Sequence, residues 1–159
     1  MAVEINLGLL LPRDSRTVPV ARHICREALR ELGVLEECRS DIEVALTEAC
    51  TNVLEHSGPG DNYEVDVTLD EEQCVIRVVD HGHGFDSTAP VMPAAEEAEG
   101  GRGISLMHAL VDKVQFNSRP EEGTVVHLEK GLEYEEGAPV PALTRRNGSS
   151  GSWRPSWPR

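Results

Sequence analysis

The sequence predicts an α/β (α+β) two-layer sandwich, in which a mixed, largely antiparallel sheet has helices on one face. Three observations support this prediction. Apolar residues recur at helical spacing over residues 18–55, and then alternate with polar residues over residues 63–79. A short helix and a pair of strands follow over residues 104–128. The 159 residues suffice for one such domain with a short appendage.

The first third of the chain is expected to form a strand and two helices. Residues 4–11 are apolar enough for a strand, which Pro12 ends. A helix over residues 18–32, stopped by Gly33, is predicted by four apolar residues at helical spacing: Ile24, Ala28, Leu29 and Leu32. A second helix over residues 36–55 has an apolar stripe of five residues: Ile42, Ala45, Leu46, Ala49 and Val53.

The rest of the domain is expected to complete the sheet. Residues 63–69 and 75–79 alternate as strands do, with a turn between them. Residues 86–100 are rich in Ala, Pro and Glu without periodicity and read as a loop. A helix over residues 104–111 and two strands, over residues 114–117 and 125–128, follow that loop.

A change of composition near Gly131 predicts the domain organisation. Residues 131–159 are rich in Gly, Ser and Pro, so we expect a mostly disordered tail after a domain formed by residues 1–130. The tail contains four Arg and three Glu, whereas the whole chain has a net charge of −13. The acidity therefore belongs to the folded domain.

The charge and the cysteines limit the class of partner and the compartment. A net charge of −13 argues against binding to a nucleic-acid backbone or to an anionic membrane. The sequence contains no uncharged apolar run of about 20 residues that could span a bilayer. The four cysteines lack the spacing of metal ligands, and a cytoplasmic protein with reduced thiols is expected.

Three clusters of residues could form a ligand site. Glu48 and Asn52 lie four residues apart on the second predicted helix, so they share one helix face. Asp80, Gly82 and Gly84 directly follow an apolar strand, where a carboxylate can accept hydrogen bonds and glycines allow a ligand to approach the backbone. Gly100 to Ile104 open a helix, and amides at a helix N-terminus form an anion site.

In this order the clusters resemble the ATP-binding domain shared by gyrase, Hsp90, histidine kinases and MutL. Glu48 and Asn52 are similar to its N box, and Asp80, Gly82 and Gly84 to its first glycine box. Gly101, Arg102 and Gly103 are similar to the second glycine box, and Gly123 and Thr124 to the final Gly-Thr pair. The resemblance covers residues 4–130 and implies the Bergerat ATP-binding fold. Within this superfamily the chain most resembles bacterial anti-sigma factor serine/threonine kinases.

The resemblance implies a role for each residue in binding ATP and Mg²⁺. Asn52 is expected to coordinate Mg²⁺, and Asp80, supported by Thr124, to accept the adenine amino group. Glu48 is expected to orient or deprotonate the attacking hydroxyl. The amides around Gly101, Arg102, Gly103 and Ile104 are expected to hold the phosphates under a lid formed by residues 86–100. The implied partners are a sigma factor, a STAS-type anti-anti-sigma protein that is phosphorylated, and a second copy of the chain.

One departure from the family pattern keeps an alternative open. The expected lid contains no Lys, and its charged residues are all acidic: Asp86, Glu96, Glu97 and Glu99. Arg102 is then the nearest candidate cation for the γ-phosphate. The alternative function is a catalytically silent, nucleotide-gated binding module that regulates a sigma factor or another partner.

Overall fold

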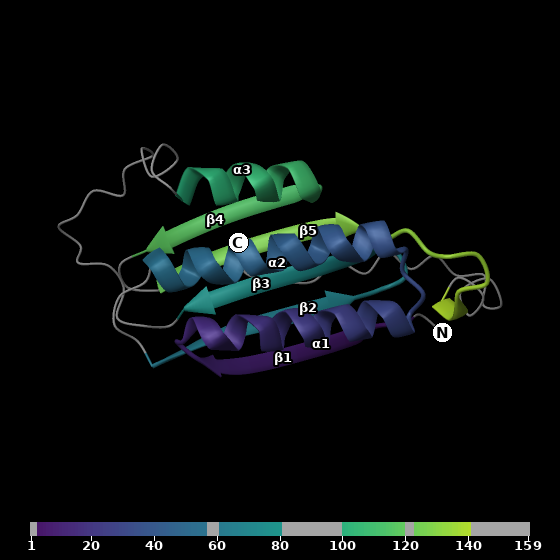
Figure 1. Ribbon diagram of the computed structural model, residues 1–159, viewed down its shortest axis with the longest axis horizontal. Helices are drawn as coiled ribbons and strands as arrows, with labels where there is room; N and C mark the ends of the chain where they lie inside the picture. The colour runs from purple at the N-terminus through teal and green to yellow at the C-terminus, as the bar shows by residue number, and fades with distance from the viewer. Residues whose placement is uncertain (1–2, 57–60, 81–99, 120–122, 141–159) are drawn as a thin grey trace.

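The fold is known from a computed structural model that describes residues 3–56, 61–80, 100–119 and 123–140. In chain order its elements are β1 (Ile5–Pro12), the 3-10 turn η1 (Ser15–Thr17), α1 (Val18–Glu31), α2 (Glu36–His56), β2 (Asn62–Leu69), β3 (Gln73–Asp80), α3 (Gly100–Leu110), β4 (Lys113–Arg119) and β5 (Gly123–Gly131). The three α-helices cover one face of the five-stranded sheet (Figure 1). The predicted two-layer sandwich is confirmed.

The strands follow the order β1-β2-β3-β5-β4, and all four pairings are antiparallel. The prediction of a largely antiparallel sheet is therefore confirmed, but the described pairings include none of the parallel pairs that a mixed sheet would contain. Because direction alternates from strand to strand, β1 and β3 end at the same edge of the sheet, where β2 and β5 begin. This edge lies on the left in Figure 1.

The helices bury their apolar faces against the sheet, and α2 lies at the centre of the helical layer. All five residues of the predicted α2 stripe have 0–1% exposure. In α1 the buried face is instead Val18, Ala21, Cys25 and Leu29, and Ile24 is 38% exposed. The prediction for Ile24 is wrong because the stripe at i, i+4 spacing passes through Cys25, one position further along the helix.

The last described helix, α3, begins at Gly100, four residues before the predicted start. Its glycines therefore occupy the first helical turn instead of the preceding loop. Met107 anchors the helix, since its side chain has no exposed surface. None of the helices in the described ranges is long and apolar enough to cross a membrane.

The packed part of the chain extends beyond the predicted boundary at residue 130. The amide of Leu35 donates to the carbonyl of Glu133, and the amide of Glu135 donates to the carbonyl of Gly33, each at 2.8 Å. Val140 is buried in the core. Composition did not predict that this segment is packed, because its few apolar residues stand among Gly, Pro and Glu. In the structure these residues pack near the connection between α1 and α2. Residues 141–159 of the predicted tail lie outside the described residues.

Candidate functional site

The predicted site residues that the structure describes come together at one edge of the sheet. This edge holds the last turns of α2, the end of β3, the start of β5 and the first turn of α3 (Figure 1). Asn52, Asp80 and Thr124 lie on these elements, although 28 residues separate Asn52 from Asp80 and a further 44 precede Thr124. The antiparallel sheet and the direction of α2 produce this convergence.

Burial distinguishes these three residues from the other polar residues. Four polar or charged residues are buried within the described ranges: Asn52, Thr68, Asp80 and Thr124. Asp80 and Thr124 have 0% exposure, and Asn52 has 3%. Burying a polar group costs free energy unless it gains hydrogen bonds, so a cluster of such groups at one sheet edge indicates a functional site.

Asp80 and Thr124 face one another across the sheet. Asp80 is the last residue of β3 and pairs directly with Thr124 in the β3–β5 ladder. The alternation along β3 places Asp80 on the same face as the buried side chains of Ile76 and Val78. The carboxylate and the hydroxyl therefore meet on the helix-covered face of the sheet.

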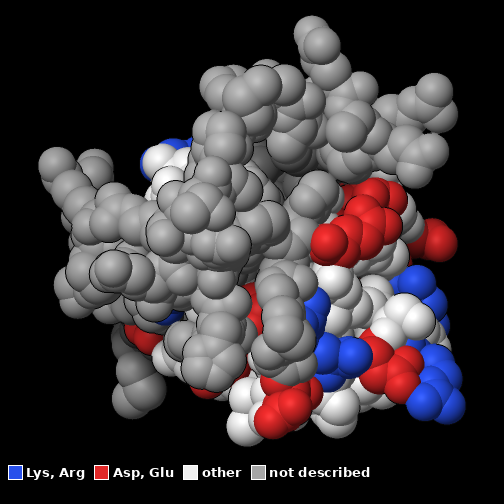
Figure 2. Space-filling model, turned by 90° about the vertical axis from the view of Figure 1, so that its left-hand side faces the viewer, with Lys and Arg blue, Asp and Glu red and all other residues white. Residues whose placement is uncertain are grey.

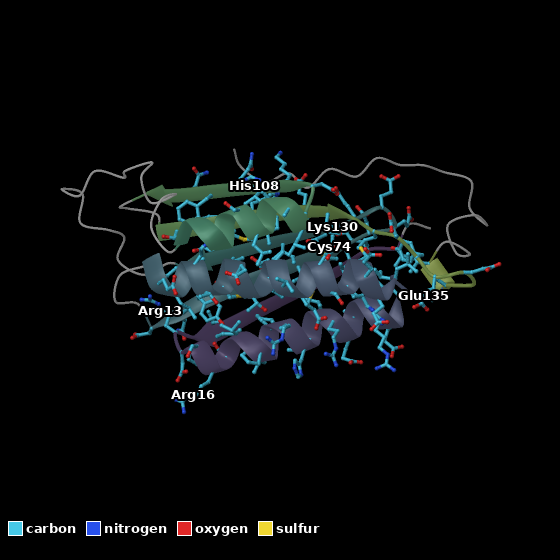
Figure 3. All side chains as sticks on the ribbon, turned by 45° about the horizontal axis from the view of Figure 1, so that its top comes forward. Arg13, Arg16, Cys74, His108, Lys130 and Glu135 are labelled. Atoms are coloured by element: carbon cyan, nitrogen blue, oxygen red, sulfur yellow. The ribbon has the colours of Figure 1, made fainter. Side chains whose placement is uncertain are left out.

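Arg13 also lies at this edge, although none of the sequence motifs predicts it as a site residue. Its Nε lies 3.3 Å from Oδ2 of Asp80, and its Nη2 donates to the carbonyl of Leu54 at 3.1 Å. Figure 3 places Arg13 at the site edge and Cys74 toward the opposite edge. The position of Arg13 directly after the predicted first strand becomes informative only once the strand pairing is known, because β1 and β3 end at the same edge when both pair antiparallel with β2.

The face of α2 near this edge presents an amide and a carboxylate. Nδ2 of Asn52 is buried and has no hydrogen-bond partner among the described residues. Glu48 lies one turn earlier on the same helix face and is half-buried. A donor left unsatisfied in this way is costly, and a bound ligand that accepts its hydrogen bond would remove the cost.

Cys50 lies between these two residues in the sequence but is not a candidate nucleophile. Its side chain is fully buried, and burial raises the pKa of the thiol to about 12. The thiol is therefore neutral near pH 7, whereas the thiolate is the reactive form. Cys50 belongs to the core between α2 and its neighbours, and all four cysteines are free thiols.

Gly101, Arg102 and Gly103 lie in the first turn of α3 and Ile104 follows them, so the predicted phosphate-binding segment is the N-terminal part of this helix. The N-terminal amides of a helix lack intrahelical acceptors, so in a helix that begins at Gly100 the amides best placed to donate to a ligand are those of Gly101 and Arg102. Gly82, Gly84 and residues 86–99 of the predicted lid lie outside the described residues. Their predicted roles remain predictions.

Charged side chains of both signs surround the described part of this edge. Figure 2 views the molecule from this side and shows Lys and Arg beside Asp and Glu. Arg16 pairs with Asp14 there, and its hydrogen bonds lower the pKa of Asp14 to about 2. The described residues contain no group of three or more His, Cys, Asp or Glu side chains able to hold a metal ion. Mg²⁺ commonly binds through one or two protein oxygens together with substrate phosphates, and the Asn52 side chain has such an oxygen.

Comparison with known proteins assigns this arrangement to a family. Residues 11–130 match the histidine kinase-like ATPase domain. A serine-protein kinase RsbW from Halalkalibacterium halodurans is 31% identical over 141 residues, covering 82% of this chain and 86% of the relative. An anti-sigma F factor from Pasteuria penetrans is 34% identical over 108 residues, covering 62% of this chain and 71% of the relative.

A solved structure agrees with this assignment at the level of the fold. The crystal structure of the RsbU and RsbW domains of Rv1364c from Mycobacterium tuberculosis superimposes with a TM-score of 0.63 at 22% identity. The match covers 80% of this chain and 32% of that longer chain. The chain therefore belongs to the histidine kinase-like ATPase family, in which its relatives include serine-protein kinases and anti-sigma factors.

Proposed function

We propose that this chain is an ATP- and Mg²⁺-dependent serine/threonine protein kinase of the cytoplasm that acts as an anti-sigma factor. The single observation that supports this most strongly is the burial of Asn52, Asp80 and Thr124 together at one sheet edge. The names of the relatives give the class of reaction, since they include serine-protein kinases and anti-sigma factors.

The residues at the end of the β3–β5 ladder suit recognition of adenine. Asp80 is a buried carboxylate that can accept a hydrogen bond from the adenine amino group. Thr124, directly opposite, would support the base with its hydroxyl group. In the proposal Gly82 and Gly84 allow the base to approach the backbone.

The helical elements suit the phosphates and the metal. The amides of Gly101 to Ile104 would hold the β- and γ-phosphates, with Arg102 as the nearest cation. Asn52 would hold Mg²⁺ through its side-chain oxygen. When bound, ATP supplies the phosphoryl group and Mg²⁺ neutralises charge on the phosphates.

Glu48 is the proposed catalytic residue. Its place one helical turn before Asn52 puts a half-buried carboxylate beside the proposed metal ligand. There it would orient the substrate hydroxyl, or accept its proton, as the γ-phosphoryl group is transferred. The remaining catalytic effect comes from positioning and charge neutralisation.

The proposed partners are a sigma factor, a STAS-type anti-anti-sigma protein and a second copy of this chain. Phosphorylation of a serine or threonine on the STAS-type protein would release it from the kinase. The kinase would then hold the sigma factor. Anti-sigma F factors among the relatives support the first of these partners.

The test begins with ATP binding in the presence and absence of Mg²⁺, followed by transfer of labelled phosphate to STAS-type proteins encoded near the gene. We expect binding to tighten with Mg²⁺ and a STAS-type protein to become labelled. Glu48→Ala is expected to bind ATP but not to transfer phosphate. If none of these proteins is labelled under conditions where ATP binds, the chain is not a kinase of this class.

The nucleotide-gated module without catalysis is favoured by one feature, the predicted lid without Lys. The same variants distinguish the two functions in a reporter assay for the sigma factor. If Glu48→Ala signals normally and only Asn52→Asp abolishes the response, then nucleotide binding alone sets the partner-competent shape.

A further inference from the structure

Arg13 connects three segments of the chain at the site edge. Its backbone amide donates to the carbonyl of Asp61 at 3.1 Å, immediately before β2. Its guanidinium contacts Oδ2 of Asp80 at 3.3 Å and donates to the carbonyl of Leu54 at 3.1 Å. The end of β1 is therefore joined to the end of β3 and to the last turn of α2.

The contact with Asp80 provides a countercharge that a buried carboxylate needs. The side chain of Asp80 has 0% exposure, and that of Arg13 has 13%. An uncompensated charge at such a position is strongly unfavourable, so the pair holds the carboxylate in one place. The planar, rigid guanidinium also restricts the direction in which the carboxylate points.

The contact with Leu54 orders the other half of the site. Leu54 lies in the last turn of α2, where backbone carbonyls lack intrahelical donors. Arg13 supplies a donor to one of these carbonyls two residues after Asn52. One side chain thus fixes the elements that position the proposed adenine acceptor and the proposed metal ligand.

We infer that Arg13 is a positioning residue for adenine recognition, which aligns the Asp80 carboxylate with the 6-amino group of the base. The inference rests on the proposed function, in which Asp80 accepts that amino group. A carboxylate has about four lone-pair sites, so Asp80 can keep the guanidinium and still accept from a ligand. Arg13 itself does not need to touch the nucleotide.

The test compares ATP with purine riboside triphosphate, which lacks the 6-amino group. We expect the wild-type chain to bind ATP at least about tenfold more tightly, as for a hydrogen bond to a charged acceptor. Arg13→Ala is expected to reduce this ratio below about threefold, because a misaligned Asp80 carboxylate no longer accepts a good hydrogen bond from the 6-amino group. Arg13→Lys, which keeps the charge, is expected to restore part of the ratio.

Arg16→Ala is the matched control. Arg16 stands three residues away, is 88% exposed and pairs with Asp14 at the surface. Its removal is expected to leave the binding of both nucleotides and their ratio as in the wild type. The fold of every variant is checked by its unfolding midpoint, and if Arg13→Ala is unfolded, Arg13→Gln is measured in its place.

The outcomes separate this inference from the function on which it rests. If Arg13→Ala weakens both nucleotides equally and keeps the wild-type ratio, Arg13 is only structural and the inference is wrong. If the wild-type chain does not distinguish ATP from the analogue, the proposed role of Asp80 is wrong and the inference fails with it. A ratio that falls in Arg13→Ala and recovers in Arg13→Lys supports the inference.

Discussion

At the scale of single residues, Asp80 is the most constrained charged group of the site. It occupies the last position of β3, has no exposed surface, pairs with Thr124 across the ladder and contacts Arg13, which directly follows β1. A buried carboxylate is stabilised by a cationic partner and by hydrogen bonds. Its position is therefore sensitive to every element of the edge.

We expect Asp80→Asn to weaken ATP binding about tenfold or more, because the amide is a poorer acceptor for the amino group and leaves Arg13 without its charge partner. Isothermal titration with ATP and Mg²⁺ measures the effect. Asp14→Asn is the control, since Asn can still accept the amide hydrogen bond from Arg16 at the surface. If Asp80→Asn binds ATP with the same affinity as the wild type, Asp80 does not contribute to ATP binding.

At the scale of elements, the C-terminal segment depends on one glycine between α1 and α2. Gly33 has a φ of +80°, and a Cβ added there would lie 2.5 Å from Cβ of Ala138. The amide of Glu135 donates to the carbonyl of this same residue. Gly33 is therefore needed both to end α1 and to let residues 133–140 approach the helices.

Gly33→Ala is expected to lower the free energy of unfolding by about 2–4 kcal/mol, because it combines an unfavourable φ with a steric clash. Gly137→Ala is the matched control. Gly137 has the same φ of +80°, but nothing lies within 4 Å of an added Cβ, so its cost is about 1–2 kcal/mol. Urea denaturation of both variants gives the comparison. Equal losses would show that the contact with Ala138 has no energetic effect.

At the scale of the whole molecule, residues 131–140 complete the core. Tyr134 donates its hydroxyl to the carbonyl of Asp70 at 3.2 Å, and Ala138 and Val140 are buried. These contacts connect residues 131–140 to the β2–β3 turn as well as to the helices. The packing unit therefore includes more of the chain than composition indicates.

Removing residues 131–140 is expected to destabilise the fold. A chain ending at Lys130 should lose about 2–5 kcal/mol of unfolding free energy relative to a chain ending at Val140, because it loses four buried or half-buried apolar side chains: Leu132, Tyr134, Ala138 and Val140. The two truncated chains are compared by urea denaturation at the same pH. Equal midpoints would place the end of the folded unit at residue 130.

The buried thiols and phenols predict how the stability depends on alkaline pH. Burial raises the pKa of Cys50 from 9.0 to about 12 and that of Tyr134 from 10.0 to about 12. Both groups are neutral when protonated, so the fold holds these protons more tightly than the unfolded chain. The contribution of these raised pKa values to the free energy of unfolding is fully present below pH 9 and is lost as the pH rises toward 12.

We therefore expect the free energy of unfolding to fall between pH 9 and pH 12, by about 4 kcal/mol from Cys50 alone. Urea denaturation at a series of pH values measures this decline. Cys50→Ala lacks the titrating thiol and should show a shallower decline over the same range. An identical slope in the variant and the wild type would show that Cys50 does not contribute.

The sequence by itself determined the type and order of the elements, since the change from helical to alternating periodicity depends only on neighbouring residues. It also predicted candidate nucleotide-binding residues, because Glu48, Asn52, Asp80 and Thr124 stand in motifs that resemble those of a known ATP-binding family. The antiparallel order of the strands then brings three of these residues to one edge.

Only the tertiary structure decided the contacts between distant segments. The ion pair of Arg13 with Asp80 joins residues 67 positions apart, and no local pattern marks one arginine among many as its partner. The docking of residues 131–140 likewise depends on a surface between α1 and α2 that exists only after folding. The periodicity of a segment predicts which face of the helix or strand is buried. Which other segment packs against that face depends on the packing of the whole chain.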